Sequence, residues 1–319
     1  MPKALLSTAS LTALILLSVL LPPLPAQTAP RGTPPKSVDE MKIDTWNSLP
    51  LHGSDYRGVK SAPAPKRDLS GFWDATGDRG NGPPPGIQIN GANEHRAVLP
   101  RNSAPEGGES DERNIPNPLP YTPFGEATLK THKPTGQGVR AVPSALGNDP
   151  VNICDPPGFP RMELSEFRNL EIEQTTDHVL ILNQNYRTWR TVWTDGRELP
   201  AEPDPRWYGY SVGKWVDDYT FVVQTIGLND KTWLDNQGRP HTSDLRVEER
   251  FHRIDYDHMD LTVTITDPKM YTQPWQGLSK FPLRRQPRGF DIREIYCSPS
   301  DLAEYQEDVG DSAPAPSDK

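Results

Sequence analysis

Hydrophobic and polar residues alternate in short runs over the second half of the chain. Leu261, Val263 and Ile265, for example, are separated by threonines. This period of two is typical of a β-strand with one buried and one exposed face. Turn residues separate the runs. The pattern predicts strands at Asn169–Thr175, His178–Asn183, Thr188–Thr194, Trp207–Val212, Thr220–Ile226, Leu245–Ile254, Leu261–Thr266 and Asp291–Cys297.

Strands this short, spaced by tight turns, favour antiparallel hairpins in series. A sheet of eight or nine such strands must protect its edges, and closure into a barrel does so. One more strand-like run, Gly71-Phe72-Trp73, resembles the Gly-x-Trp motif that closes the base of calycin-type barrels. We therefore predict an all-β fold, an antiparallel meander closing into a calycin- or lipocalin-like barrel. A curved open sheet or a sandwich is the alternative.

One predicted strand carries a carboxylate on its apolar face. Between Leu245 and Ile254, alternation places Glu249 in line with Val247 and Phe251, so that Glu249 points inward. A buried carboxylate needs a partner or it becomes neutral. Glu249 is then either a structural residue paired with an arginine such as Arg253, or an acid or base with a raised pKa that faces a ligand.

The loop before this strand, residues 229–244, is long and polar but contains a tryptophan. Long loops without secondary structure are usually functional or disordered, and a tryptophan argues against disorder. We predict a structured flap at the mouth of a pocket. Its candidate ligand contacts are Trp233 and Lys231, with Arg253 from the strand. The candidate catalytic residues of this region are His241, Glu249, Asp230 and Asp235.

Tryptophans also mark the strand predicted at Thr188–Thr194. Trp189 and Trp193 share one face of it, with Arg190 on the other. They either pack in the core or form an aromatic wall for a flat or sugar-like ligand. We include both as candidate ligand contacts.

Composition divides the chain into five segments. Residues 1–26 combine Lys3, an apolar stretch and a proline-rich end, which predicts a secretion signal rather than a retained membrane anchor. Most of the 36 prolines precede residue 161. They predict a flexible Pro-rich arm at 27–66, and a first strand followed by a Pro/Gly-rich extended segment at 67–148. The barrel body is expected at 149–298 and an acidic, disordered tail at 299–319.

Charge and cysteine content indicate the compartment and exclude several classes. The chain has a net charge of −9 and no basic block, so we expect no nucleic-acid partner. The only two cysteines are Cys154 and Cys297. In an exported protein they predict a disulfide that would contribute about 4–5 kcal/mol by loop closure. We expect a periplasmic or extracellular protein that is not inserted in the membrane after signal removal.

No phosphate-binding loop, HExxH, Cys-x-x-Cys or nucleophile elbow occurs in the sequence. We therefore expect no organic cofactor. His241, Asp244 and Glu249 do not match a known metal-ligand spacing, so no metal site is expected either.

Several motifs together resemble a family of uncharacterised exported bacterial proteins. They lie between about Asp149 and Cys297 and imply one exported domain, but no activity. The motifs are Thr194-Asp195-Gly196-Arg197, Trp207 to Trp215 (WYGYSVGKW), Asn229 to Asp235 (NDKTWLD), Pro240-His241, Glu249-Arg250-Phe251, Asp267 to Tyr271 (DPKMY) and Tyr296-Cys297.

Three functions remain open at this point. The first is a binding protein for a small amphipathic or aromatic ligand held in the barrel. The second is a cofactor-independent hydrolase, lyase or isomerase that uses a His/carboxylate pair at the barrel mouth. This enzyme hypothesis requires Asp230, His241 and Glu249 to converge in one cavity. The third is a structural or surface-interaction protein. If Glu249 is held in a closed ion pair and side chains fill the barrel, both pocket hypotheses fail and this third one gains support.

Overall fold

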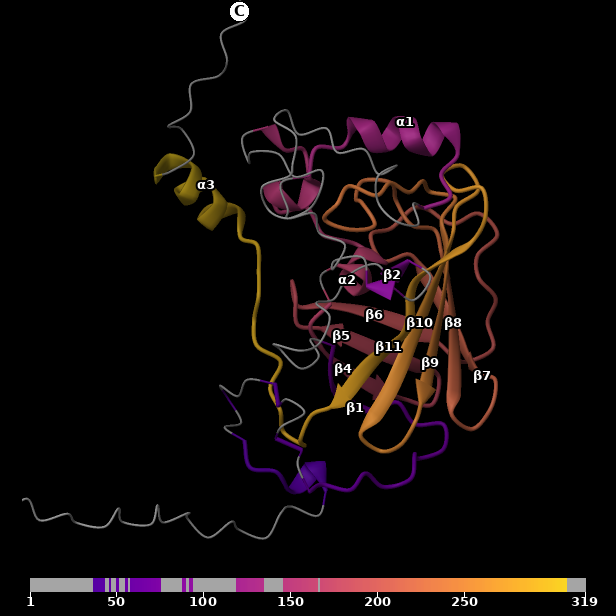
Figure 1. The fold of residues 1–319 in the computed structure, drawn as a ribbon, viewed down its shortest axis with the longest axis vertical. Helices are drawn as coiled ribbons and strands as arrows, with labels where there is room; N and C mark the ends of the chain where they lie inside the picture. The colour runs from indigo at the N-terminus through magenta and orange to yellow at the C-terminus, as the bar shows by residue number, and fades with distance from the viewer. Residues whose placement is uncertain are drawn as a thin grey trace, which may run out of the picture. The chain divides into compact units, whose positions relative to one another are not determined.

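Nine strands form a closed barrel in the order β1-β11-β10-β9-β8-β7-β6-β5-β4 (Figure 1). The computed structural model describes residues 37–43, 46, 50–51, 55–56, 58–75, 88–89, 92–93, 119–134, 146–165 and 167–308. The predicted signal peptide lies outside these ranges. The barrel strands are β1 (Gly71–Asp74), β4 (Asn169–Gln174), β5 (His178–Asn183), β6 (Thr188–Trp193), β7 (Tyr210–Trp215), β8 (Thr220–Ile226), β9 (Arg246–Arg253), β10 (His258–Thr266) and β11 (Trp275–Arg285). Outside the barrel, β2 (Gln88–Ile89) pairs with β3 (Ala92–Asn93).

The predicted closed all-β barrel is confirmed, with one departure from an antiparallel meander. β6 and β7 pair in parallel, with Val192 opposite Ser211. The chain between them, residues 194–209, returns along the barrel instead of making a hairpin, so β7 starts at the same end as β6. β1 closes the barrel: Phe72 lies opposite Glu171 of β4, and Trp73 opposite Arg285 of β11.

The last barrel strand is not the predicted one. β11 covers Trp275–Arg285, whereas Asp291–Cys297 forms no strand and contributes only an isolated bridge from Ile295 to Asn185. Gly277 and Pro282 interrupt the pattern of β11, and its pairing with β10 slips between Leu261 and Val263. Such a bulge removes the strict alternation by which a strand is found in a sequence.

Side chains fill the barrel. β10 alternates strictly, and its inward residues Met259, Leu261, Val263 and Ile265 are fully buried. Large rings from other strands join them, among them Trp73, Phe221, Phe251 and Phe281. A barrel of this strand number either fills with side chains or holds a small ligand. In the described part of this chain, apolar side chains take most of the interior, together with one buried charged cluster around Arg190.

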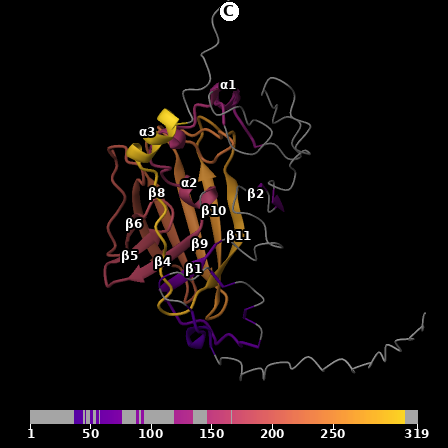
Figure 2. The ribbon, with the colours of Figure 1, turned by 90° about the vertical axis from the view of Figure 1, so that its left-hand side faces the viewer.

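Helices and loops cover the two ends of the barrel (Figures 1 and 2). The α1 helix (Pro123–Thr131) lies over one end, and the segment containing the 3-10 turn η1 (Val38–Glu40) lies at the other. α1 falls in the segment predicted to be extended, which is a correction. Proline is tolerated as the first residue of a helix, and Thr122 caps this one by accepting a hydrogen bond from the Gly125 backbone N–H.

Two further helices lie near the limits of the predicted barrel body. α2 (Arg161–Leu164) is a single turn whose four residues are all buried. α3 (Pro299–Asp308) is helical where the sequence predicts a disordered tail. None of the helices in the described ranges is long and apolar enough to cross a membrane.

The predicted disulfide is present. Cys154 and Cys297 are bonded, with 5.3 Å between their Cα atoms. Cys154 follows the 3-10 turn η5 (Pro150–Ile153), and Cys297 ends the segment after β11. The bond therefore ties the C-terminal segment to the entry of the barrel body.

Candidate functional site

Glu249 lies inside the barrel and is fully buried, which confirms its inward direction. Its partner is Arg190 of β6. Arg190 Nη1 and Nη2 donate to Glu249 Oε2 and Oε1, both at 2.5 Å, and Nη2 also donates to Glu163 Oε1 of α2 at 3.1 Å. The guanidinium lies 3.9 Å from the ring centre of Phe159. Bidentate pairing of this kind is the strong form of the arginine–carboxylate contact.

The two carboxyl groups of this cluster have different roles. Burial raises the pKa of Glu163 well above its usual range; the negative charge of Glu249 adds to this effect, and Arg190 opposes it. The surroundings of Glu163 therefore favour its protonated form, and the charge of Arg190 is neutralised by Glu249. The cluster joins α2 to β6 and β9, and its geometry is that of a structural core element.

Arg253 was predicted as a partner of Glu249 or as a ligand contact, but the structure places it against the Gly-x-Trp strand. It is buried, and its guanidinium lies 4.7 Å from the ring centre of Trp73. Its Nη2 donates to the Tyr256 carbonyl oxygen at 2.8 Å. Burial, together with the charge of Arg285, lowers the pKa of Arg253 to about 10. Arg253 thus supports the Gly-x-Trp strand.

The flap, residues 229–244, is packed against the barrel end. Trp233 is buried and stacks on His132, with ring centres 4.6 Å apart. Asp235 accepts hydrogen bonds from the backbone of Gln237 and Arg239 and pairs with the Arg239 side chain. Lys231 is exposed. Trp233 and Asp235 therefore hold the flap in shape.

His241 is buried in the flap. Its Nδ1 lies 3.2 Å from the Thr242 carbonyl oxygen, so this nitrogen carries the proton. Burial lowers the pKa of His241, while the carboxylates of Asp267 and Asp230 oppose the shift. The structure thus brings Asp230 into electrostatic reach of His241. Glu249, the third residue required by the enzyme hypothesis, is held by Arg190.

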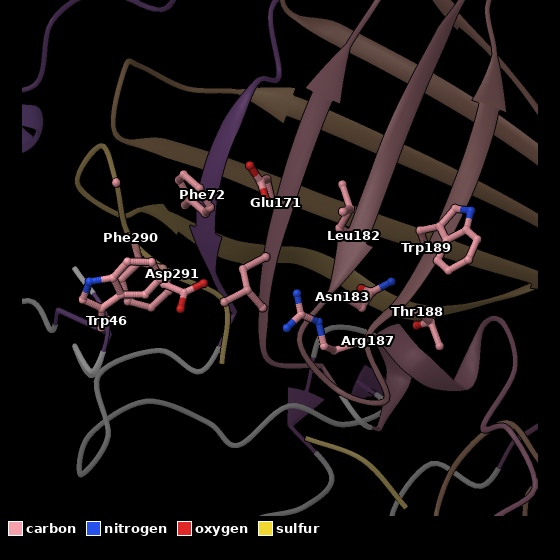
Figure 3. Close-up of a pocket in the computed structure, with 12 residues that line it drawn as sticks. Trp46, Phe72, Glu171, Leu182, Asn183, Arg187, Thr188, Trp189, Phe290 and Asp291 are labelled. Atoms are coloured by element: carbon pink, nitrogen blue, oxygen red, sulfur yellow. The ribbon is translucent and has the colours of Figure 1, made fainter. Parts of the chain in front are cut away.

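A hollow of about 400 Å³ lies elsewhere, on the outer wall of the barrel (Figure 3). We call it the wall groove. Its floor is a row of outward side chains, one from each of four neighbouring strands. Phe72 of β1 lies opposite Glu171 of β4, Glu171 opposite Leu182 of β5, and Leu182 opposite Trp189 of β6. At about 4.8 Å per strand, this row spans roughly 14 Å.

One rim of the groove is the segment Gly289–Ile292, which follows β11. Phe290 packs edge-on against Phe72, with ring centres 6.2 Å apart. The segment continues to Cys297, where the disulfide anchors it. We call residues 289–297 the strap. The disulfide therefore fixes one side of the groove.

The strap also holds the turn between β5 and β6. Tyr186 and Arg187 adopt left-handed conformations, with φ of 60° and 42°, each of which costs about 1–3 kcal/mol for a residue other than glycine. The strap offsets this strain: Tyr186 N donates to the Ile295 carbonyl oxygen at 2.6 Å, and Arg187 pairs with Glu294 at 2.8 Å. This turn places Arg187 at the groove edge.

The groove carries a carboxylate with a perturbed pKa. Partial burial raises the pKa of Glu171, and the nearby carboxylates of Glu173 and Asp291 raise it further. Perturbed titratable groups in a hollow mark candidate functional sites.

The predicted tryptophans face the outside of the barrel. Trp189 lines the groove and is 66% exposed, whereas Trp193 lies beyond it under the guanidinium of Arg197. Since Arg190 is on the inward face of β6, the interior aromatic wall is not formed by these two residues. Nothing in the sequence pattern singled out Phe72, Glu171, Leu182 and Phe290 as ligand contacts. The alternation of β4 and β5 indicates their outward positions, but it does not show which of them are neighbours.

No protein-family model, curated protein or solved structure matches this chain. Within the ranges that the structure describes, no group of three or more His, Cys, Asp or Glu residues could hold a metal ion. The function must therefore be inferred from the chemistry of the groove and of the barrel interior.

Proposed function

We propose that this chain is an exported protein that binds a small amphipathic or aromatic molecule in the wall groove. The observation that carries the proposal is Trp189, a large apolar side chain that is 66% exposed in a hollow of about 400 Å³. Ligand sites of roughly 300–1,000 Å³ are lined by apolar and aromatic groups with a few placed polar ones. Phe72, Leu182 and Phe290 supply the first kind, and Glu171 and Arg187 the second.

The groove is also well suited to keep its shape without a ligand. Three of its floor residues come from β4, β5 and β6, and sites built on strands are more rigid than sites on loops. The strap that forms the rim is tied at one end by the disulfide. A preorganised site loses less entropy on binding.

The ion-paired Glu249 and the filled barrel speak against a ligand inside the barrel and for the surface-interaction alternative. The binding proposal therefore rests on the wall groove, which lies outside the barrel. Binding there is favoured over the enzyme alternative by the partners of the candidate catalytic residues. Glu249 pairs with Arg190, and Asp235 pairs with Arg239. The neutral His241 is bonded through Nδ1 to a backbone oxygen. Export is supported by the disulfide, because such bonds persist in oxidising compartments.

A fragment screen by two-dimensional NMR on the mature, disulfide-bonded protein tests the proposed function. The set contains neutral aromatic, sugar, anionic and cationic fragments. We expect hits whose shift changes map to β4–β6 and the strap, and which are lost in Trp189→Ala. Trp193→Ala is the matched control, since it removes the same residue type from the same face of the same strand. If no fragment shifts the groove residues, the proposal is wrong.

A further inference from the structure

The charges around the wall groove are unbalanced. Glu171 and Asp291 line it, and Glu173 acts on Glu171 from the neighbouring outward position of β4. Among the lining residues that the structure describes, Arg187 is the one positive group, and it is paired with Glu294. In the described part of the chain, the ion pairs leave Glu171 and Asp291 without a cationic partner. The groove therefore carries an excess of negative charge beside aromatic rings.

Other aromatic rings on the outer wall of the barrel are covered by arginine side chains. The Arg197 guanidinium lies 3.5 Å from the ring centre of Trp193, and that of Arg206 lies 4.0 Å from the ring centre of Tyr210. Among the described residues, no guanidinium covers Trp189 in this way. The exposed ring of Trp189 is therefore open to contact with another molecule.

The two ends of the groove floor differ in chemistry. Glu171 lies directly opposite Phe72, with Phe290 packed against that ring (Figure 3). Leu182 follows, and Trp189 stands at the far end. The acidic and aromatic end and the exposed tryptophan are two strands apart, roughly 10 Å. This distance fits one molecule with a charged head and an apolar or aromatic body.

We propose that the wall groove binds an organic cation, an ammonium or guanidinium head carried on an aromatic or aliphatic body. The head lies between the carboxylates of Glu171 and Asp291, beside the ring of Phe72, against which the buried Phe290 packs. The body lies over Leu182 against Trp189. Aromatic faces attract cations through their quadrupole, and carboxylates add direct charge attraction. This inference rests on the proposed function and specifies the ligand class of the same site.

Three indole probes of the same ring and similar length separate the contribution of charge from that of apolar contact. Tryptamine is cationic at pH 7, tryptophol is neutral, and indole-3-acetate is anionic. Their affinities for the mature, disulfide-bonded protein are measured by isothermal titration calorimetry. We expect tryptamine to bind about tenfold more tightly than tryptophol, and indole-3-acetate to bind most weakly. Added salt should weaken tryptamine binding and leave tryptophol binding unchanged.

Groove variants assign the effect to these residues. In Glu171→Gln and Asp291→Asn the ratio of tryptamine to tryptophol affinity should fall towards one, with tryptophol binding retained. Glu248→Gln removes an exposed carboxylate from β9, outside the groove, and should leave the ratio unchanged. Trp189→Ala should weaken both probes.

The results separate failure of this inference from failure of the proposed function. If tryptophol or indole-3-acetate binds as tightly as tryptamine, and Trp189→Ala weakens that binding, the groove binds ligands but the cation inference is wrong. If none of the three probes binds, the cation inference is also wrong, and the wider fragment screen decides the proposed function.

Discussion

Replacing Arg190 with methionine tests whether the ion cluster inside the barrel is closed and desolvated. Arg190 is 4% exposed and Glu249 is fully buried. Methionine is an unbranched apolar residue that replaces the aliphatic part of the arginine side chain, but it cannot pair with a carboxylate. Glu249 would then be left as an unpaired buried charge beside Glu163.

The expected loss is large compared with the stability of a single domain. Removing one partner of a buried ion pair costs about 3–5 kcal/mol, against a total of roughly 5–15 kcal/mol. For a domain of this size each kcal/mol corresponds to roughly 2–4 °C in Tm. The Arg190→Met variant should therefore melt about 6–20 °C below the wild type.

Urea unfolding at pH 7, followed by tryptophan fluorescence with the disulfide intact, measures the free energy of unfolding. The matched control is Arg250→Met on β9, which removes an exposed arginine paired with Glu248 at 3.7 Å. Such surface pairs contribute about 0–1 kcal/mol. A loss below about 1 kcal/mol for Arg190→Met would refute the assignment of a buried cluster.

A triple variant examines the same reasoning from the opposite direction. Glu163→Leu, Arg190→Met and Glu249→Leu together remove every charge of the cluster. Replacing a buried ion cluster with apolar residues of similar volume is often neutral or stabilising. We expect the triple variant to be clearly more stable than Arg190→Met alone. Equal instability of the two would show that packing, and not charge burial, dominates at Arg190.

Because the native pKa of Glu163 is raised above 4.5, the unfolding free energy should fall as pH rises above that value. The fall should be up to about 1.4 kcal/mol per pH unit and should end when Glu163 ionises in the native state. Glu163→Gln should flatten this profile, and identical profiles for the two proteins would refute the role of Glu163. Replacing Cys154 and Cys297 with alanine should lower the unfolding free energy by about 2–5 kcal/mol. It should also weaken tryptamine binding in calorimetry, because the strap is released. An unchanged tryptamine affinity would exclude a role of the strap in the groove. Trp189→Ala should change the unfolding free energy by less than about 0.5 kcal/mol, whereas Trp73→Ala should cost about 3–5 kcal/mol in the same urea assay. Comparable losses in the two variants would contradict the exposure of Trp189 and the burial of Trp73.

Where a short apolar run was bounded by turn residues, the sequence alone was sufficient to locate the barrel strand. The bounds of β5 (His178–Asn183) and β8 (Thr220–Ile226) were predicted as they are found. Period two also predicted that Glu249 points inward, because Val247 and Phe251 fix the face of the strand. The cysteine pair was predicted for an equally simple reason, since an exported chain with two cysteines has one possible bridge.

Only the tertiary structure decided which residues meet across the barrel. A bulge hides β11 from any search for alternation, and pairing register, which no single strand encodes, brings Arg190 rather than Arg253 to Glu249. The wall groove depends on register in the same way. Its floor comes from four strands, and its rim is a strap that lies a hundred residues or more further along the chain than any floor residue. The groove therefore exists only once the barrel has closed.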